Sequence, residues 1–356
     1  MRKFRVLEQS LIALLVTLFL ACTTPSKVED APAKAPSRVE GKGPAAPVAA
    51  SWVSQNKASC LGPVEGGESS VLSLSNGKWE RSGSTLTWLE GESDSILRLG
   101  VVSDIKEATP QNGVNAARFL GKFKDQKVDL ILIAGDVSEE PKDIETAIGW
   151  FAAGGIPVGV IIGNREGVRA YEAAMGRLGK RFPNVVDLNR VRRIDTPNGD
   201  VISLPGYYDP NYLHAEDGCH YTESDLASLT TLKAACDSPV LLISHGGPRQ
   251  SGPEAIDRTS EGANVGDPGL TTAIKELGIQ FGVFGNVHEA GGRGTDIEGR
   301  KLSPAKAHQT LFLNPGPLDS VRWVMNDRSE STGMAAVFSI EGGRGTYEVL
   351  RQGAVN

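Results

Sequence analysis

Histidine, cysteine and aromatic residues are scarce in this chain, and their scarcity limits the sites that it can build. The 356 residues include five His and four Cys, and aromatic residues make up 6%. No two cysteines have the Cys-x-x-Cys spacing of structural zinc sites, so a cysteine-based metal cluster is not expected. A metal site in this chain would therefore rely on oxygen ligands and a small number of imidazoles.

The chain also has no excess of positive charge. It contains 37 Lys and Arg against 43 Asp and Glu, which gives a formal net charge of −6. An N-terminal segment that we expect to be removed holds Arg2, Lys3, Arg5 and Glu8, so the remaining chain is more acidic still. Nucleic-acid binding depends on basic surfaces that neutralise phosphates, and we therefore expect no nucleic-acid partner.

The N-terminal apolar run, residues 11–21, is too short for an ordinary transmembrane helix but suits the core of a signal peptide. Basic residues precede it, and the four residues that end in Cys22 resemble a bacterial lipobox. We expect residues 1–21 to be a lipoprotein signal peptide and lipidated Cys22 to anchor the exported protein to a bacterial membrane. An ordinary signal peptide that happens to contain Cys22 is the alternative. Thr23 favours the periplasmic side of the outer membrane.

Two segments separate this signal from the main part of the chain. Residues 22–50 are rich in Pro, Ala, Lys, Glu and Gly and hold too few large apolar side chains to offset the entropy of ordering. We expect a disordered tether there. Residues 51–95 include Asn76-Gly77 between apolar residues, a hairpin signal that predicts a small β element.

Three short apolar segments in the next part of the chain end in a breaker, as buried strands do. Segments with the helical spacing of apolar residues lie between them. Right-handed crossovers would bring the polar residues that follow the strands to the carboxyl edge of one parallel sheet. Oxygen ligands at such an edge suit a hard or borderline divalent cation. The segments are residues 96–103, 128–134 and 156–162, and they are followed by Asp104, Asp136 and Asn164.

Two later strands of the same kind end in histidine-bearing turns. Residues 239–244 precede His245, and residues 281–284 precede a turn with Asn286 and His288. Imidazoles at these strand ends can join the carboxylates in one site.

In this order the strand ends resemble the calcineurin-like metallophosphoesterase family. Its signature is Asp-x-His, Gly-Asp, Gly-Asn-His-Asp/Glu, a His after a strand, and Gly-His-x-His, and Asn314-Pro315-Gly316 is similar to a turn near its end. The resemblance covers about residues 96–345. It implies an α/β fold for residues 96–356, a four-layer α/β/β/α sandwich to which the N-terminal β element is added, and a two-metal site that hydrolyses phosphoesters.

The chain departs from the family pattern at three positions. Lys106 stands where Asp-x-His has its His, Asn286 replaces the first His of Gly-His-x-His, and Arg165 replaces the His of Gly-Asn-His. The resemblance assigns that last His to leaving-group protonation or phosphoryl stabilisation, so Arg165 takes the catalytic position.

The departures leave both implied metal positions incomplete. We expect at most one divalent ion, Mn, Fe or Zn, and a site without metal is the alternative. The first position keeps Asp104, Asp136 and His288, and the second keeps Asp136, Asn164 and His245, with Asn286 as a weak oxygen ligand.

Two functions remain open on this basis. One is a weakly active or non-catalytic protein that binds phosphate or another anion through Lys106 and Arg165. If Lys106 and Arg165 bind no anion, they form ordinary ion pairs with Asp104 and Asp136 instead. The alternative function is an active metal-dependent phosphoesterase that cleaves phosphomonoesters or phosphodiesters with one metal ion.

The remaining cysteines bear on the compartment of the protein. After Cys22 the chain has Cys60, Cys219 and Cys236. In an oxidising compartment Cys219 and Cys236 can form a disulfide that leaves Cys60 unpaired. Cys60 can compete for either partner, so the sequence leaves the pairing open.

Overall fold

The computed structural model describes residues 60–64, 69–91, 94–237, 239–304 and 306–352. They belong to one compact unit, Lys57–Asn356. The expected signal peptide, Cys22 and the tether lie outside the described residues. Among the residues described, no helix has the length and apolar character needed to cross a membrane.

A six-stranded sheet carries the first half of the candidate site. Its strand order is β17-β16-β4-β5-β6-β7, with β4 to β7 parallel and with β16 and β17 antiparallel to their neighbours. The expected strands before Asp104, Asp136 and Asn164 are confirmed as β4, β5 and β6. The strands are β4 (Ile96–Val102), β5 (Leu130–Ala134), β6 (Val158–Ile161), β7 (Val185–Asp187), β16 (Met334–Glu341) and β17 (Arg344–Arg351).

A nine-stranded sheet carries the second half of the site. Its order is β1-β2-β3-β8-β9-β10-β11-β13-β12, and β9, β10, β11 and β13 run parallel. A separate two-stranded sheet consists of β14 (Trp323–Val324) and β15 (Glu330–Ser331). The nine strands are β1 (Ser69–Leu74), β2 (Gly77–Ser82), β3 (Thr85–Glu90), β8 (Arg193–Thr196), β9 (Gly199–Leu204), β10 (Val240–Ser244), β11 (Phe281–Val283), β12 (Arg293–Thr295) and β13 (Leu311–Asn314).

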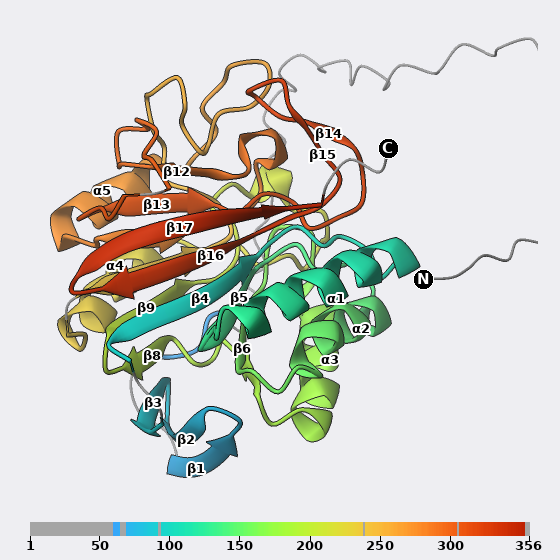
Figure 1. The fold of residues 1–356 in the computed structure, drawn as a ribbon, viewed down its shortest axis with the longest axis vertical. Helices are drawn as coiled ribbons and strands as arrows, with labels where there is room; N and C mark the ends of the chain where they lie inside the picture. Colours follow the sequence, from blue (N-terminus) through green and yellow to red (C-terminus); the bar gives the residue numbers. More distant parts are fainter. Residues whose placement is uncertain (1–59, 65–68, 92–93, 238, 305, 353–356) are drawn as a thin grey trace, which may run out of the picture. The chain divides into compact units, whose positions relative to one another are not determined.

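The two sheets pack face to face, and helices cover their outer faces, which gives the expected four-layer sandwich (Figure 1). Helices α1 to α3 lie over the six-stranded sheet, and α4 and α5 lie over the nine-stranded sheet. The bounds are α1 (Pro110–Asp125), α2 (Pro141–Ala152), α3 (Val168–Arg181), α4 (Glu223–Ala234) and α5 (Pro268–Leu277), with short 3₁₀ turns η1 (Pro210–Tyr212) and η2 (His288–Ala290).

The continuous apolar strands follow from this layering. Leu130 and Leu132 of β5 face the opposite sheet, whereas Ile131 and Ile133 face the helices. Both faces of the strand are buried, so no polar residue alternates with the apolar ones. Full burial of each such side chain stabilises the fold by about 1.5–3 kcal/mol.

The strands β1 to β3 extend the nine-stranded sheet through parallel pairing of β3 with β8. The turn between β1 and β2 lies at the predicted Asn-Gly pair, where Gly77 has a φ of 138°. Trp79 and Trp88 are buried and stack with their ring centroids 5.3 Å apart. These rings anchor the added strands to the core.

One disulfide joins Cys60 to Cys219, and Cys236 is a free cysteine. The pairing of Cys219 with Cys236 is therefore wrong. Cys60 pairs with Cys219 instead, which is an alternative that the sequence left open. The reason is tertiary: the Cα atoms of Cys60 and Cys219 lie 5.7 Å apart although 159 residues separate them in sequence.

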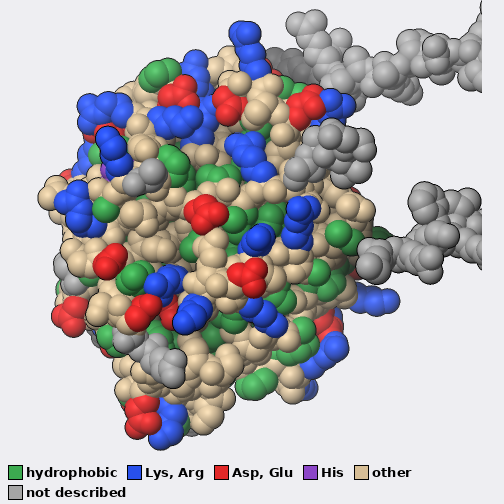
Figure 2. Space-filling view, viewed as in Figure 1, with side chains coloured by type: hydrophobic (Ala, Val, Ile, Leu, Met, Phe, Trp, Pro, Cys, Tyr) green, Lys and Arg blue, Asp and Glu red, His purple; other side chains and the backbone are tan. Residues whose placement is uncertain are grey.

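On the face shown in Figure 2, basic and acidic side chains are interspersed instead of gathering by sign. That face therefore offers no extended basic surface among the described residues.

Candidate metal centre

Four residues of the candidate site have a left-handed backbone, which is uncommon outside glycine. Their φ angles are 53° at Asp104, 65° at Lys106, 54° at Asp136 and 66° at Asn286. Such conformations cost of order 1 kcal/mol or more each and persist only where the surroundings hold them. The sharp turns after the strands aim the side chains toward the space between the two sheets' carboxyl edges.

Two glycines let the strand ends come this close. Gly135 has a φ of 85°, and a Cβ there would lie 2.7 Å from Gly163 Cα. A Cβ on Gly163 would lie 2.3 Å from Asp136 Oδ1. The glycines in the Gly-Asp and Gly-Asn motifs are therefore required for packing around the carboxylate.

His245 is held in a single orientation by three neighbours. Its Nδ1 lies 2.8 Å from the carbonyl oxygen of Ala134, and its Nε2 lies 2.8 Å from Asn164 Oδ1 and 3.2 Å from Asp136 Oδ1. A carbonyl only accepts hydrogen bonds, so Nδ1 donates, and Nε2 faces the two side-chain oxygens. The amide nitrogen of Asn164 donates to the carbonyl of Tyr212 at 2.7 Å, which fixes the Asn164 oxygen toward the histidine.

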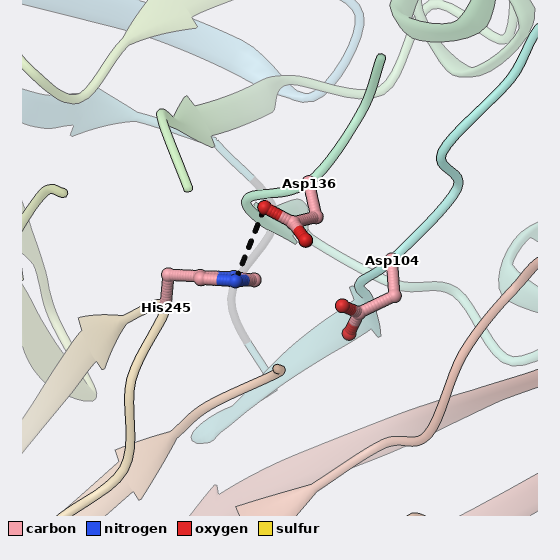
Figure 3. A group of neighbouring side chains, drawn as sticks. All are labelled: Asp104, Asp136 and His245. Atoms are coloured by element: carbon pink, nitrogen blue, oxygen red, sulfur yellow. Dashed lines mark ion pairs between the residues drawn. The ribbon is translucent and has the colours of Figure 1, made fainter. Parts of the chain in front are cut away.

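Asp104, Asp136 and His245 form one buried group whose ligand atoms all lie within 4.8 Å of one another. The three side chains converge from separate strand ends (Figure 3). A carboxylate pair and an imidazole at this spacing are suitable donors for a divalent ion.

The electrostatics of the group reflect its burial and its charges. Burial lowers the pKa of His245, but the Asp136 carboxylate outweighs this and raises the pKa to about 10. Burial raises the pKa of Asp104, yet the imidazoles of His288 and His245 bring it well below its usual value. The pKa of Asp136 is also lowered by His245 in spite of burial. Without a metal, His245 is therefore the counter-ion of the carboxylates at neutral pH.

Glu166 braces the two loops that carry the ligands. It is fully buried, and its carboxylate accepts hydrogen bonds from the backbone N–H groups of Val137 and Ser138 on one loop and Gly163 on the other. Burial raises the pKa of Glu166 to about 7. The glutamate that ends the Gly-Asn-Arg-Glu motif therefore positions the two loops that carry the ligands.

Lys106 is paired with a residue that the sequence motifs did not indicate. Its Nζ lies 2.9 Å from Asp319 Oδ2 and 4.1 Å from the ring centroid of Trp323. His288 stands next to it, with Nδ1 at 3.5 Å from the ammonium and Nε2 at 3.2 Å from Asp104 Oδ1. The ammonium thus lies beside the residues of the implied first metal position.

Arg165 also has its own partner, since its Nη1 lies 3.1 Å from Glu139 Oε1. Its backbone N–H, and not its guanidinium, donates to Asp136 Oδ1 at 3.0 Å. The arrangement in which Lys106 and Arg165 form ion pairs with Asp104 and Asp136 is therefore wrong. The physical reason is that each cation lies next to a different carboxylate, that of Asp319 for Lys106 and that of Glu139 for Arg165.

Asn286 turns its amide nitrogen away from the carboxylates. The amide donates to the Tyr207 hydroxyl at 3.0 Å, and its backbone N–H donates to Asp104 Oδ2 at 3.1 Å. The Tyr207 ring lies 6.2 Å from the His245 ring, so this tyrosine borders the site.

Sequence reasoning missed Asp319, Trp323 and Glu139 as neighbours of the site. Asp319 follows the Asn-Pro-Gly turn closely in sequence, which was an available signal. Trp323 comes from β14 and Glu139 from the loop before α2, and neither carries a motif.

A family model described as calcineurin-like phosphoesterase matches residues 97–290, more than half of the chain. The chain belongs to this family. No curated protein matches the sequence significantly.

Several solved structures are similar to this chain. One crystal structure superposes with a TM-score of 0.51 over 72% of this chain and 99% of that chain, at 12% identity. The protein TT1561 of Thermus thermophilus gives 0.46 at 14% identity, over 67% of this chain and 98% of its own. A dimetal phosphatase of Danio rerio gives 0.44 at 13% identity, over 72% and 99%. At 12% identity, the likeness to the first of these structures concerns the fold alone.

Divalent-metal binding by this protein should tighten as the pH rises, because an ion at His245 must displace the proton on Nε2. With the pKa of His245 raised to about 10, the affinity for Mn²⁺ should increase by about tenfold per pH unit between pH 7 and 9. The same shift predicts that the metal-free protein loses stability as the pH rises from about 6.5 through about 10, since the raised pKa stabilises the fold only while His245 is protonated. Calorimetric titration with Mn²⁺ between pH 7 and 9 tests the predicted affinity, and an affinity that does not change with pH would contradict the prediction.

Proposed function

We propose that this calcineurin-like phosphoesterase is an exported lipoprotein that binds a phosphate-containing ligand beside one divalent ion and hydrolyses it weakly or not at all. The observation that carries the proposal is the ion pair of Lys106 with Asp319 next to His288. Lys106 stands where the family has a histidine ligand, and its ammonium, held by Asp319, offers no lone pair to a divalent ion.

The second metal position fits one ion. Asp136 and Asn164 offer oxygens and His245 offers Nε2, and these three atoms already meet at hydrogen-bonding distance. A backbone carbonyl accepts from Nδ1 of His245, an outer contact that metal-bound histidines usually have. A bound ion would polarise a phosphoryl oxygen and help to orient the ligand.

The proton donor of the family is replaced by an arginine, Arg165. Arg165 can contribute charge and hydrogen bonds to a phosphoryl group, but its guanidinium does not give up a proton. General acid catalysis contributes about 10²–10⁴-fold to a rate, so its absence supports low turnover.

The metal content of the purified mature protein tests this proposal. We expect at most one Mn, Fe or Zn ion per chain, and we expect His245→Gln to lose it. His308→Gln is the matched control, because His308 is a half-buried histidine whose Nε2 hydrogen-bonds the carbonyl of Ser303, away from the candidate centre. Two tightly bound ions with rapid hydrolysis of an aryl phosphodiester would refute the proposal.

An active one-metal phosphoesterase is the second candidate. It is favoured by the survival of His288 and Asp104, which remain in contact at 3.2 Å although the family pattern around them has changed. Hydrolysis by the unmodified protein that requires added manganese and disappears in Asp136→Asn would support this candidate.

The lipoprotein part of the proposal rests on the N-terminal sequence and on the disulfide in the folded domain. A disulfide between Cys60 and Cys219 suits an oxidising compartment such as the periplasm. We propose anchoring through lipid on Cys22, on the periplasmic side of the outer membrane.

Cys22→Ser should release the protein from the membrane or leave its signal peptide uncleaved. Fractionation with detection of the N-terminus measures this, with Cys236→Ser as a control that keeps Cys22. An unmodified protein that is found in the soluble fraction with Met1 intact would contradict the anchor.

A further inference from the structure

His288 is the histidine that the implied first metal position requires, and both of its ring nitrogens have close neighbours. Nε2 lies 3.2 Å from Asp104 Oδ1, and Nδ1 lies 3.5 Å from Lys106 Nζ. The centroid of the Trp323 ring lies 4.3 Å from that of the imidazole, so the indole packs against it as well. The groups that face the two nitrogens decide which of them carries the proton of the neutral ring.

The two neighbours of the imidazole select the same tautomer independently. A carboxylate only accepts hydrogen bonds, so Nε2 carries the proton and donates it to Asp104. An ammonium only donates, so Nδ1 presents its lone pair to Lys106. The opposite tautomer would set an N–H dipole against the ammonium and a lone pair against the carboxylate, and both contacts would be repulsive.

The ammonium of Lys106 is held in its place beside Nδ1. The backbone N–H of Lys106 donates to the Asp136 carbonyl at 2.9 Å, and its Nζ lies 2.9 Å from Asp319 Oδ2. Asp319 is itself fixed, because Trp323 Nε1 donates to its Oδ1 at 2.8 Å and its backbone N–H donates to the Asp104 carbonyl at 3.3 Å. The imidazole therefore faces a fixed donor.

The other histidine of the centre is held in the reverse way. Nδ1 of His245 donates to the Ala134 carbonyl, and Nε2 faces the side-chain oxygens of Asp136 and Asn164. A metal-bound histidine ligates through a lone pair and donates its other ring N–H to an acceptor such as a carbonyl. His245 meets this requirement once Nε2 releases its proton. His288 does not, because a cation stands where its second N–H would need an acceptor.

We infer that Lys106 is a positioning residue that keeps the proton of His288 on Nε2 and thereby prevents this histidine from ligating an ion. His288 is then a hydrogen-bond donor to Asp104 instead of a metal ligand. The first metal position is thus closed by the tautomer of His288 in addition to the departures at Lys106 and Asn286. This inference rests on the proposed function, because it explains why the centre holds one ion.

Nitrogen-15 NMR of the purified mature protein without metal tests the tautomer directly. At about pH 8.5, above the ordinary titration range of imidazoles, we expect His288 to show a protonated Nε2 and an unprotonated Nδ1. The His288 resonances are assigned by their absence from the spectrum of His288→Gln. A proton on Nδ1 in the unmodified protein would overturn the inference.

Two replacements of Lys106 test its effect on metal binding. The amide of Lys106→Gln can donate to Asp319 and accept from Nδ1, so His288 can take the ligating tautomer. Lys106→Arg keeps a group that only donates and is the matched control. We expect Lys106→Gln to bind Mn²⁺ at a second site at least about tenfold more tightly than Lys106→Arg, because the contact between Nδ1 and a charged donor no longer opposes ligation.

Calorimetric titration of both folded variants with Mn²⁺ measures this difference. Equal second-site binding by Lys106→Gln and Lys106→Arg would overturn the inference and leave the proposed function standing. Two tightly bound ions in the unmodified protein would overturn both. If Lys106→Gln does not fold, the NMR spectrum of the unmodified protein still decides the tautomer and with it the inference.

Discussion

Replacing Lys106, Arg165 and Asn286 together by histidine should give a protein that binds two divalent ions per chain and hydrolyses an aryl phosphodiester at least about 10²-fold faster than the unmodified protein. The expected gain comes from restoring the family pattern on a scaffold where Asp136 and His245 already converge. Elemental analysis and turnover with added manganese measure the two effects.

The contacts of Lys106 also predict which replacements at this position allow the protein to fold. Asp319 is buried, and a simple removal of the ammonium would leave its carboxylate without a counter-ion, although Trp323 Nε1 still donates to it at 2.8 Å. The loss of the counter-ion should cost about 3–5 kcal/mol. An imidazole introduced at position 106 can donate to that carboxylate, so Lys106→His should fold where Lys106→Met is destabilised.

Single reversions are the controls for the triple variant. Each should change activity little, because residues that act as a unit are not additive. A triple variant that folds but binds no more metal than the unmodified protein would show that the remaining ligands are not placed for two ions.

Cys60→Ser should lower the free energy of unfolding by about 4–5 kcal/mol, the chain-entropy value for a loop as long as the one that this disulfide closes. Cys60 and Cys219 are separated by 159 residues, so their bond restricts the unfolded chain strongly. Phosphate binding at the proposed site should also weaken, because the Cys219 carbonyl accepts the backbone N–H of Tyr207, which borders the candidate metal centre. Urea unfolding at equilibrium measures the first effect.

Cys236→Ser is the matched control for the disulfide. Burial and the neighbouring Asp200 raise the pKa of the Cys236 thiol to about 12, so this cysteine is a poor nucleophile in the folded protein. We expect its replacement to change stability by less than about 1 kcal/mol. A loss as large as that in Cys60→Ser would mean that Cys236 forms the disulfide.

The strands that carry the site could be predicted because their signal is local. A buried parallel strand is apolar on both faces, so β4, β5 and β6 are visible as short runs of Val, Ile and Leu, each ended by a glycine or a polar residue. Right-handed crossover connections then place Asp104 and Asp136 at one edge without further information. Order along the chain also sufficed for the family resemblance, which the family match confirms over residues 97–290.

Lys106 and Arg165 depart from the family pattern, and their ion-pair partners could not be predicted in the same way. Lys106 meets Asp319 and Arg165 meets Glu139, and each pair joins loops that no periodic pattern relates. The range of an ion pair is a few ångströms, and only the packing of both sheets decides which carboxylate comes within it.

The sequence by itself therefore determined the fold class, the strand ends and the residue types of the candidate centre. These depend on hydrophobic periodicity and on glycine positions that are written along the chain. Only the tertiary structure decided that Cys60 meets Cys219, that Lys106 is neutralised by Asp319, and that His245 is fixed by the Ala134 carbonyl. Such contacts join distant segments, and their geometry arises when the two sheets and their loops pack.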